Sequence, residues 1–152
     1  MADQPAAPTP MPALLPGLTA SDPQATLDWF EKLGFEPTSV MELPDGSIGH
    51  AMLMRGGVGL MIGPCMQHQP GSSGMDLWID VGEADLDALC EDARDEGIAV
   101  TQEPHDEFWG DRIFEVTDPD GYRLVFRKHV RDVTPEEMQT AMAELMSAET
   151  SA

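Results

Sequence analysis

The sequence predicts an α+β fold in which two βαβββ modules pair into one curved mixed sheet around a cleft, with a further helix at the C-terminus. The order of a strand, a helix and three strands occurs twice along the chain. A glycine ends each helix at a matching place, Gly34 in the first half and Gly97 in the second. Because each helix covers only one face of its sheet, pairing the modules encloses a cleft of the kind that holds small molecules.

Length and composition limit the classes of function. The chain has 152 residues, enough for one domain or two small fused modules with a buried core. Its formal net charge is -20, with 8 Lys and Arg against 28 Asp and Glu. This balance argues against nucleic acid and anionic membrane surfaces as partners, because both need clustered basic residues, and it permits a cationic ligand. The alternative interpretation is that the acidic charge serves solubility alone.

Residues 1–12 form a Pro- and Ala-rich lead-in without the basic and apolar regions of a signal peptide. No apolar run reaches the length of a membrane span. The two cysteines, Cys65 and Cys90, make neither a disulfide framework nor a CxxC metal motif, and Cys90 is expected to be a small core residue of a helix. Together these features predict a cytoplasmic protein.

The first predicted module covers residues 13–64 and starts with a short strand over 13–20. Ser21 or Asp22 caps the following helix, and Pro23 suits its first turn. Three strands complete the module, at 36–43, 47–55 and 57–63.

A linker of residues 65–74 leads to the second module, residues 75–130, which repeats this order. A strand at 75–81 and a helix at 83–96 come first, and the later strands are predicted at 98–103, 109–117 and 121–128. The last two strands flank the segment DPDG at 118–121, whose Pro and Gly suit a turn, so the sequence FWGDRIFEVTDPDGYRLVF predicts a β-hairpin. Asp118 is expected to fix this turn through its hydrogen bonds to the backbone.

Residues 131–152 contain the last predicted helix, at 134–147. Thr134 caps it, Pro135 takes its first position and Glu137 completes a capping box. An apolar stripe runs along one side of this helix and comprises Met138, Ala141, Met142, Leu145 and Met146. The stripe either packs on its own domain or covers a partner subunit.

Three stretches of the chain resemble the vicinal-oxygen-chelate superfamily, which includes glyoxalase I, extradiol dioxygenases, fosfomycin-resistance enzymes and bleomycin-resistance proteins. They are TASDPQATLDWFEKLGF, IDVGEADLDAL and the closing hairpin, and the resemblance covers about residues 13–128. The hairpin is most similar to bleomycin-resistance and related glyoxalase-like members. The resemblance implies paired βαβββ modules, in agreement with the internal repeat.

Enzymes of this superfamily hold a divalent metal with His and Glu side chains from strands of both modules. Carried over to this sequence, the first ligand position falls on Leu15 and the last on Val125, and neither side chain ligates metal. A third position falls on Asp76, and the remaining one lies near His50 or Met52. The resemblance therefore implies a protein without the usual metal, like the bleomycin-resistance proteins, which sequester a cationic drug in clefts between two subunits.

Strand alternation assigns side chains to the cleft. The candidate ligand-binding residues are His50, Met52, Asp76, Trp78, Trp109, Asp111 and Glu115. Aromatic rings attract flat rings and cations, carboxylates attract ammonium and guanidinium groups, and Met adapts to irregular ligands. This composition predicts a receptor for a cationic, partly aromatic molecule.

Each candidate also has a plainer interpretation. Trp109 would only plug the sheet, His50 would be a hydrogen-bonded structural histidine, and Asp111 with Arg112 would form a structural ion pair or hairpin contact. Glu115 is the candidate for a catalytic role, since a carboxylate buried beside apolar groups has a raised pKa and can act as a general base.

Three functions follow as alternatives. The first is a metal-free homodimeric binding protein of the bleomycin-resistance type, which needs no cofactor. The second is a glyoxalase-like metal-dependent lyase with a displaced divalent-metal site made of His50, Asp76 and Glu115. The third is a regulatory or housekeeping module that binds no small ligand. The sequence does not name the ligand, and it leaves open whether the modules pair within one chain or across a dimer.

Overall fold

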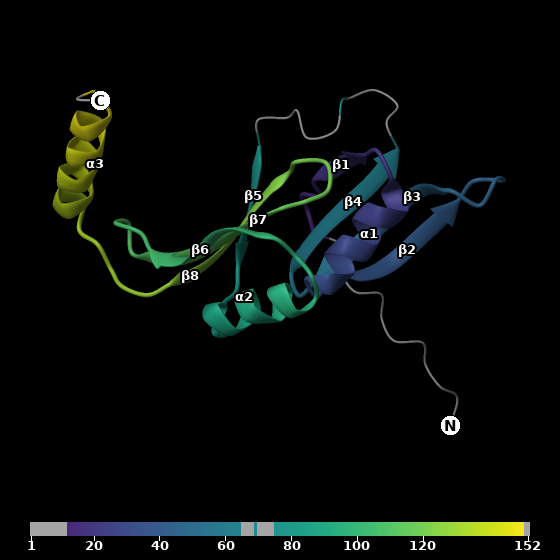
Figure 1. The fold of residues 1–152 in the computed structure, drawn as a ribbon, viewed down its shortest axis with the longest axis horizontal. Coiled ribbons are helices and arrows are strands. Elements are labelled where there is room, and N and C mark those ends of the chain that lie inside the picture. Colours follow the sequence, from purple (N-terminus) through teal and green to yellow (C-terminus); the bar gives the residue numbers. More distant parts are fainter. Residues whose placement is uncertain (1–11, 65–68, 70–74, 151–152) are drawn as a thin grey trace. The chain divides into compact units, whose positions relative to one another are not determined.

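The computed structural model describes residues 12–64, 69 and 75–150, so the predicted lead-in and linker lie almost wholly outside it (Figure 1). The chain divides into two compact units between Pro70 and Gly71. Each unit contains a four-stranded mixed sheet and a helix packed against it, in the same order along the chain. The α+β fold and the duplicated βαβββ modules predicted from the sequence are confirmed.

The first unit follows the predicted order of elements closely. They are β1 (Gly17–Ala20), α1 (Pro23–Lys32), β2 (Glu36–Glu42), β3 (Ile48–Arg55) and β4 (Val58–Pro64). The strand order is β1-β4-β3-β2, with β1 parallel to β4 and the other neighbours antiparallel. Asp22 is the N-cap of α1, and its Oδ1 accepts from the backbone N–H of Ala25 at 3.1 Å. Buried Phe30 of this helix meets Phe35 edge to face, so one side of the sheet is covered by α1.

The second unit repeats this topology and adds a helix. Its elements are β5 (Asp76–Asp80), α2 (Leu86–Asp95), β6 (Val100–Asp106), β7 (Asp111–Thr117), β8 (Arg123–His129) and α3 (Pro135–Thr150). The strand order β5-β8-β7-β6 matches that of the first unit, and β5 runs parallel to β8. The side of the sheet under α2 is apolar: Cys90 is buried as predicted, and the rings of Phe114 and Phe126 stack at 4.9 Å.

Several element boundaries of the second unit differ from those predicted. For the starts of α2 and β7 the structure shows a local reason. Helix α2 begins at Leu86 rather than at residue 83, because Asp85 is its N-cap and accepts from the backbone N–H of Ala88 at 3.1 Å. Strand β7 begins at Asp111 rather than at residue 109, because the chain turns just before it and the N–H of Gly110 donates to the carbonyl of Glu107 at 3.1 Å.

The predicted hairpin is formed by β7 and β8, which are antiparallel neighbours. Oδ1 of Asp118 accepts from the backbone N–H groups of Asp120 at 2.9 Å and Tyr122 at 2.8 Å. Gly121 has a φ of 95°, a conformation that favours glycine. Asp118 therefore fixes the turn as predicted.

Helix α3 begins with the predicted capping box. The backbone N–H of Glu137 donates to Oγ1 of Thr134 at 3.2 Å, and the N–H of Thr134 donates to the Glu137 carboxylate at 3.1 Å. Of its apolar stripe, Met142, Leu145 and Met146 are about half exposed. Within the described residues, no helix is both long and apolar enough to cross a membrane.

Candidate functional site

One face of the second sheet lies under α2 and the other points away from it, and hydrogen bonds show which residues belong to each. Arg112 of β7 and Lys128 of β8 both reach α2 or the residues before it, so their neighbours in sequence point the other way. We call the face that points away from α2 the open face. It comprises Asp76, Trp78 and Asp80 of β5, Arg123, Val125, Arg127 and His129 of β8, and Asp111, Ile113 and Glu115 of β7.

A first charged triad on the open face links three strands through Arg123. Its Nε donates to Oε2 of Glu115 at 2.9 Å, and its Nη2 donates to the other oxygen of the same carboxylate. Its Nη1 donates to Oδ2 of Asp76. Glu115 is buried, and its carboxylate is held by the guanidinium group of Arg123. The catalytic role considered for Glu115 stays a prediction.

A second triad is centred on Arg127, four residues further along β8. Its Nε donates to Oδ2 of Asp111 at 2.8 Å, its Nη2 donates to Oδ1 at 3.1 Å, and its Nη1 donates to Oδ2 of Asp80 at 2.6 Å. Each arginine therefore uses Nε and Nη2 for a buried carboxylate of β7 and Nη1 for an exposed aspartate of β5. Four carboxylates face two guanidinium groups, so the two triads carry an excess of two negative charges.

Asp111 is also the anchor of an aromatic pair. The indole Nε1 of Trp109 donates to Oδ2 of Asp111 at 3.0 Å. The ring of Trp109 lies 6.2 Å from that of Trp78, at an interplanar angle of 57°. Trp78 remains 46% exposed, which leaves much of its ring open to solvent beside a fixed neighbour.

Trp109 lies in the turn before β7, not in the strand where the sequence predicted it, and Gly110 explains how the turn is held. Gly110 has a φ of 99°, and its carbonyl accepts from the backbone N–H groups of Val130 at 2.9 Å and Arg131 at 3.1 Å. A Cβ at this position would lie 2.1 Å from the carbonyl oxygen of Arg131. The close approach of two backbone segments therefore requires glycine here and sets the place of Trp109.

The charges of the Arg127 triad are fixed by their surroundings. Burial alone would raise the pKa of Asp111, but the hydrogen bonds from Arg127, His129 and Trp109 outweigh it and hold the pKa below its ordinary value. The hydrogen bond to Asp111 raises the pKa of Arg127. Asp111 is therefore an anion over the whole neutral range.

His129 extends this triad at the end of β8. Its Nδ1 lies 3.3 Å from Oδ1 of Asp111, and its Nε2 lies 2.8 Å from Oδ1 of Asp132. The bond with Asp132, and then the bond with Asp111, raise the pKa of His129. Asp80, Arg127 and His129 were not among the residues predicted for the site. The alternation that selected Asp76 and Trp78 would have found them if it had been extended to residue 80 on β5 and to residues 127 and 129 on β8.

Arg112 does not pair with Asp111, which corrects the predicted ion pair between them. Its Nε and Nη2 both donate to the carboxylate of Asp87 on α2 at 2.8 Å, and its Nη1 donates to Asp106 at 3.0 Å. These hydrogen bonds raise the pKa of Arg112. Adjacent residues of a strand point to opposite faces, so Arg112 fastens the helix while Asp111 belongs to the open face.

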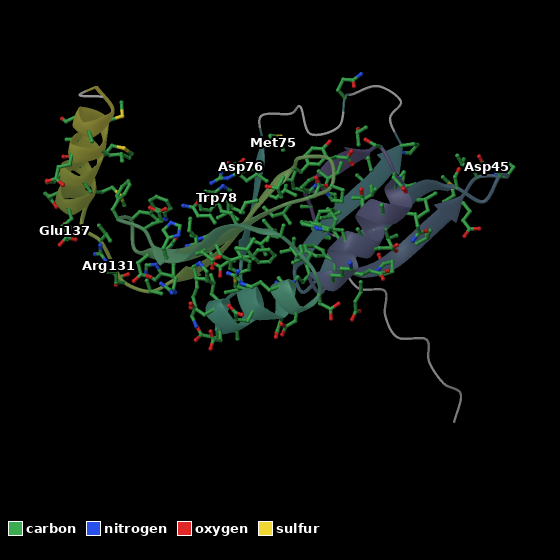
Figure 2. All side chains as sticks on the ribbon, viewed as in Figure 1. Asp45, Met75, Asp76, Trp78, Arg131 and Glu137 are labelled. Carbon is green, nitrogen blue, oxygen red and sulfur yellow. The ribbon has the colours of Figure 1, made fainter. Side chains whose placement is uncertain are left out.

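The structure places the seven predicted ligand-binding residues in both units. Asp76, Trp78, Trp109, Asp111 and Glu115 come together on or beside the open face of the second sheet. Asp76 and Trp78 both lie on β5 (Figure 2). His50 and Met52 belong to the first unit, on the side of β3 that faces away from α1. Their cross-strand neighbours are Met41 and Met61, respectively.

The family of the chain follows from residues 13–126, which match the model of the Glyoxalase/Bleomycin resistance protein/Dioxygenase superfamily. The chain belongs to this superfamily. An uncharacterized protein of Mycobacterium tuberculosis, Rv0887c, is 30% identical to it over 142 residues, which cover 87% of this chain and 83% of the relative.

Solved structures of other proteins have a similar fold. TioX from Micromonospora sp. ML1 is 25% identical, with a TM-score of 0.63 over 77% of this chain and 98% of its own. TnmS3 from Streptomyces sp. CB03234, described as an antibiotic binding protein, is 24% identical, with a TM-score of 0.58 over 76% of this chain and 93% of its own.

The residues present do not fit the metal-ligand set that the superfamily's enzymes use. Val125, at the last ligand position, lies on the open face between Trp78 and Glu115 in the strand register, and it is a buried hydrocarbon side chain. Among the described residues, no group of three or more His, Cys, Asp or Glu is arranged to hold a metal ion. The displaced metal site considered from the sequence would use His50, Asp76 and Glu115. The carboxylates of Asp76 and Glu115 both bind the guanidinium of Arg123.

Proposed function

We propose that this protein is a metal-free small-molecule-binding member of its superfamily, which holds a cationic, flat aromatic ligand on the open face of the second sheet. The observation that carries the proposal is the exposed ring of Trp78, held beside Trp109 between the two charged triads. A large apolar ring left 46% exposed within a charged surface is a favourable contact for a flat ligand.

The local charge favours a cation over an anion. The two triads carry two more carboxylates than guanidinium groups, and the whole chain has a net charge of -20. A ligand cation beside Trp78 would gain both carboxylate contacts and a cation–π contact with the ring. The antibiotic binding named for the structural relative TnmS3 agrees with a binding role rather than a chemical one.

The melting temperature of metal-stripped protein tests the proposal directly. We expect metal-free bleomycin to raise it, because a ligand that binds only the folded state stabilises by RT ln(1 + [L]/Kd), roughly 2.7 kcal/mol at a hundredfold excess over Kd. Zn²⁺, Ni²⁺, Mn²⁺ and Fe²⁺ should leave it unchanged. A shift with one of these metals and none with the drug would overturn the proposal in favour of a metal-dependent lyase.

A second experiment locates the site. Trp78→Ala should weaken drug binding by about tenfold or more, since base-like rings stacked on aromatic side chains contribute ~1–3 kcal/mol each. Trp29→Phe is the matched control, because Trp29 belongs to α1 and packs on Phe30 in the first unit. Equal affinity in wild type and the Trp78 variant would exclude this face as the binding site.

A further inference from the structure

We infer that the ligand of this face is a flat dication, with an aromatic body on Trp78 and one planar amidinium or guanidinium group on each of Asp76 and Asp80. The inference rests on the proposed function and specifies its ligand class. Asp76, Trp78 and Asp80 alternate along β5, so their side chains share the open face with the ring in the middle. The two aspartates are four residues apart, about 13 Å along a strand.

The exposed aspartates, not the buried carboxylates, are the groups that a ligand can use. Glu115 and Asp111 are 7% and 5% exposed, and each is held by two nitrogen atoms of an arginine. Asp76 and Asp80 have side chains that are 38% and 55% exposed, and each receives only Nη1 of its arginine. Exposed ion pairs contribute little to stability, so exchanging this single contact for a ligand cation costs little.

The planar cation is favoured over an ammonium group by its hydrogen-bond geometry. An amidinium or guanidinium presents two parallel N–H donors to one carboxylate, whereas Nη1 of the arginine presents one. Oδ1 of Asp80 also accepts from the backbone N–H of Gly82 at 2.7 Å, which holds this carboxylate in place for the ligand. The arginines keep their bidentate contacts to β7 throughout.

Charge balance explains why the ligand carries two positive charges. The two triads have an excess of two carboxylates, one on each side of Trp78. His129, which also contacts Asp111, has a carboxylate of its own in Asp132. A dication therefore neutralises both triads. A monocation leaves one triad with its excess negative charge, at a place where the aromatic body of the ligand has displaced water.

The test compares three probes of the same shape: biphenyl with an amidine at both para ends, biphenyl with one amidine, and biphenyl methyl ester without charge. Titrations followed by calorimetry should give the bis-amidine at least tenfold tighter binding than the mono-amidine, the size of one charge-assisted contact. Equal affinity of the two amidines, with both weakened by Trp78→Ala, would overturn the dication and leave the proposed function standing. If neither amidine binds, both the dication and the cationic aromatic site fail.

Variants of the two aspartates test whether each of them holds one end of the bis-amidine. Asp76→Asn and Asp80→Asn should each bring the affinity for the bis-amidine about tenfold down, toward that of the mono-amidine, and leave the mono-amidine within threefold. Asp92→Asn on α2 removes the same charge from an exposed position on the far side of the sheet and should change neither. An equal loss in all three variants would mean that the net charge of the protein, and not this pair of aspartates, attracts the dication.

Discussion

Arg127 holds the buried carboxylate of Asp111 through two nitrogen atoms, with Nε 2.8 Å from Oδ2 and Nη2 3.1 Å from Oδ1. Arg123 holds Glu115 through the same two nitrogens, four residues earlier on β8. In each pair the carboxylate is buried and the arginine reaches solvent. The stability of the open face therefore depends on arginines that are themselves partly exposed to solvent.

Removing one of these arginines should destabilise the protein. Arg127→Gln leaves a buried carboxylate without its partner, a change that costs ~3–5 kcal/mol for fully buried pairs and about 2 kcal/mol here, because the guanidinium is partly screened by water. Urea unfolding of wild type and variant measures this loss in the free energy of unfolding. Arg94→Gln is the control, since the carboxylates of Glu91 and Glu103 that it pairs with are exposed, and it should have little effect. Equal losses in the two variants would contradict the role of Arg127.

The stability contributed by His129 should depend on pH. Its folded-state pKa is raised by Asp132 and Asp111, so the contribution is fully present below the ordinary pKa of 6.5 and is lost as pH rises through the folded value. The difference in unfolding free energy between wild type and His129→Gln should be larger at about pH 5.5 than at about pH 9. A difference that does not change with pH would count against the contacts of His129 with these carboxylates.

The stability contributed by Asp118 should change with pH in the opposite direction to that contributed by a paired carboxylate. Burial raises its pKa, and among the described residues its Oδ2 has no hydrogen-bond partner. A raised folded-state pKa means that its ionised form is disfavoured, so wild type loses stability relative to Asp118→Asn as pH rises above the ordinary aspartate value. Unfolding curves at about pH 3.5 and about pH 7 measure this difference. A shift in favour of wild type at the higher pH would refute the cost of burying this charge.

Gly110 and Gly121 form a matched pair for the turn that places Trp109. Both have positive φ, 99° and 95°, so alanine at either position costs roughly 1–2 kcal/mol in backbone strain. Only at Gly110 would the new Cβ also meet backbone, 2.1 Å from the carbonyl oxygen of Arg131, whereas at Gly121 nothing lies within 4 Å. Gly110→Ala should therefore lower the free energy of unfolding by several kcal/mol more than Gly121→Ala, in which backbone strain acts alone.

Ligand binding should separate the same two variants. Gly110→Ala moves the turn that holds Trp109 and should weaken binding of the bis-amidine, while folded Gly121→Ala should bind it like wild type. Calorimetry at a temperature where circular dichroism shows both variants folded makes the comparison. Unchanged binding by Gly110→Ala would show that the place of Trp109 does not matter to the ligand.

The features that local sequence predicts correctly are those whose partners are near in the chain. Asp22 bonds Ala25, Thr134 and Glu137 bond each other, and Asp118 bonds residues two and four positions later. Strand alternation is equally local, and it placed Asp76, Trp78, Asp111 and Glu115 on one face. Period-two patterning and capping chemistry involve neighbours along the chain, so they can be read without knowing the fold.

The partners on the open face were decided only by tertiary structure. Arg123 and Asp76 are 47 positions apart, as are Arg127 and Asp80, and they meet because β5 runs parallel to β8 in one particular register. Alternation tells which face a side chain takes, but not which residue of another strand stands opposite. The sequence by itself therefore determined the repeated modules, their caps and the composition of this face. Long-range strand pairing, which no local pattern encodes, decided that its carboxylates are bound by arginines and that Trp78 stays exposed between them.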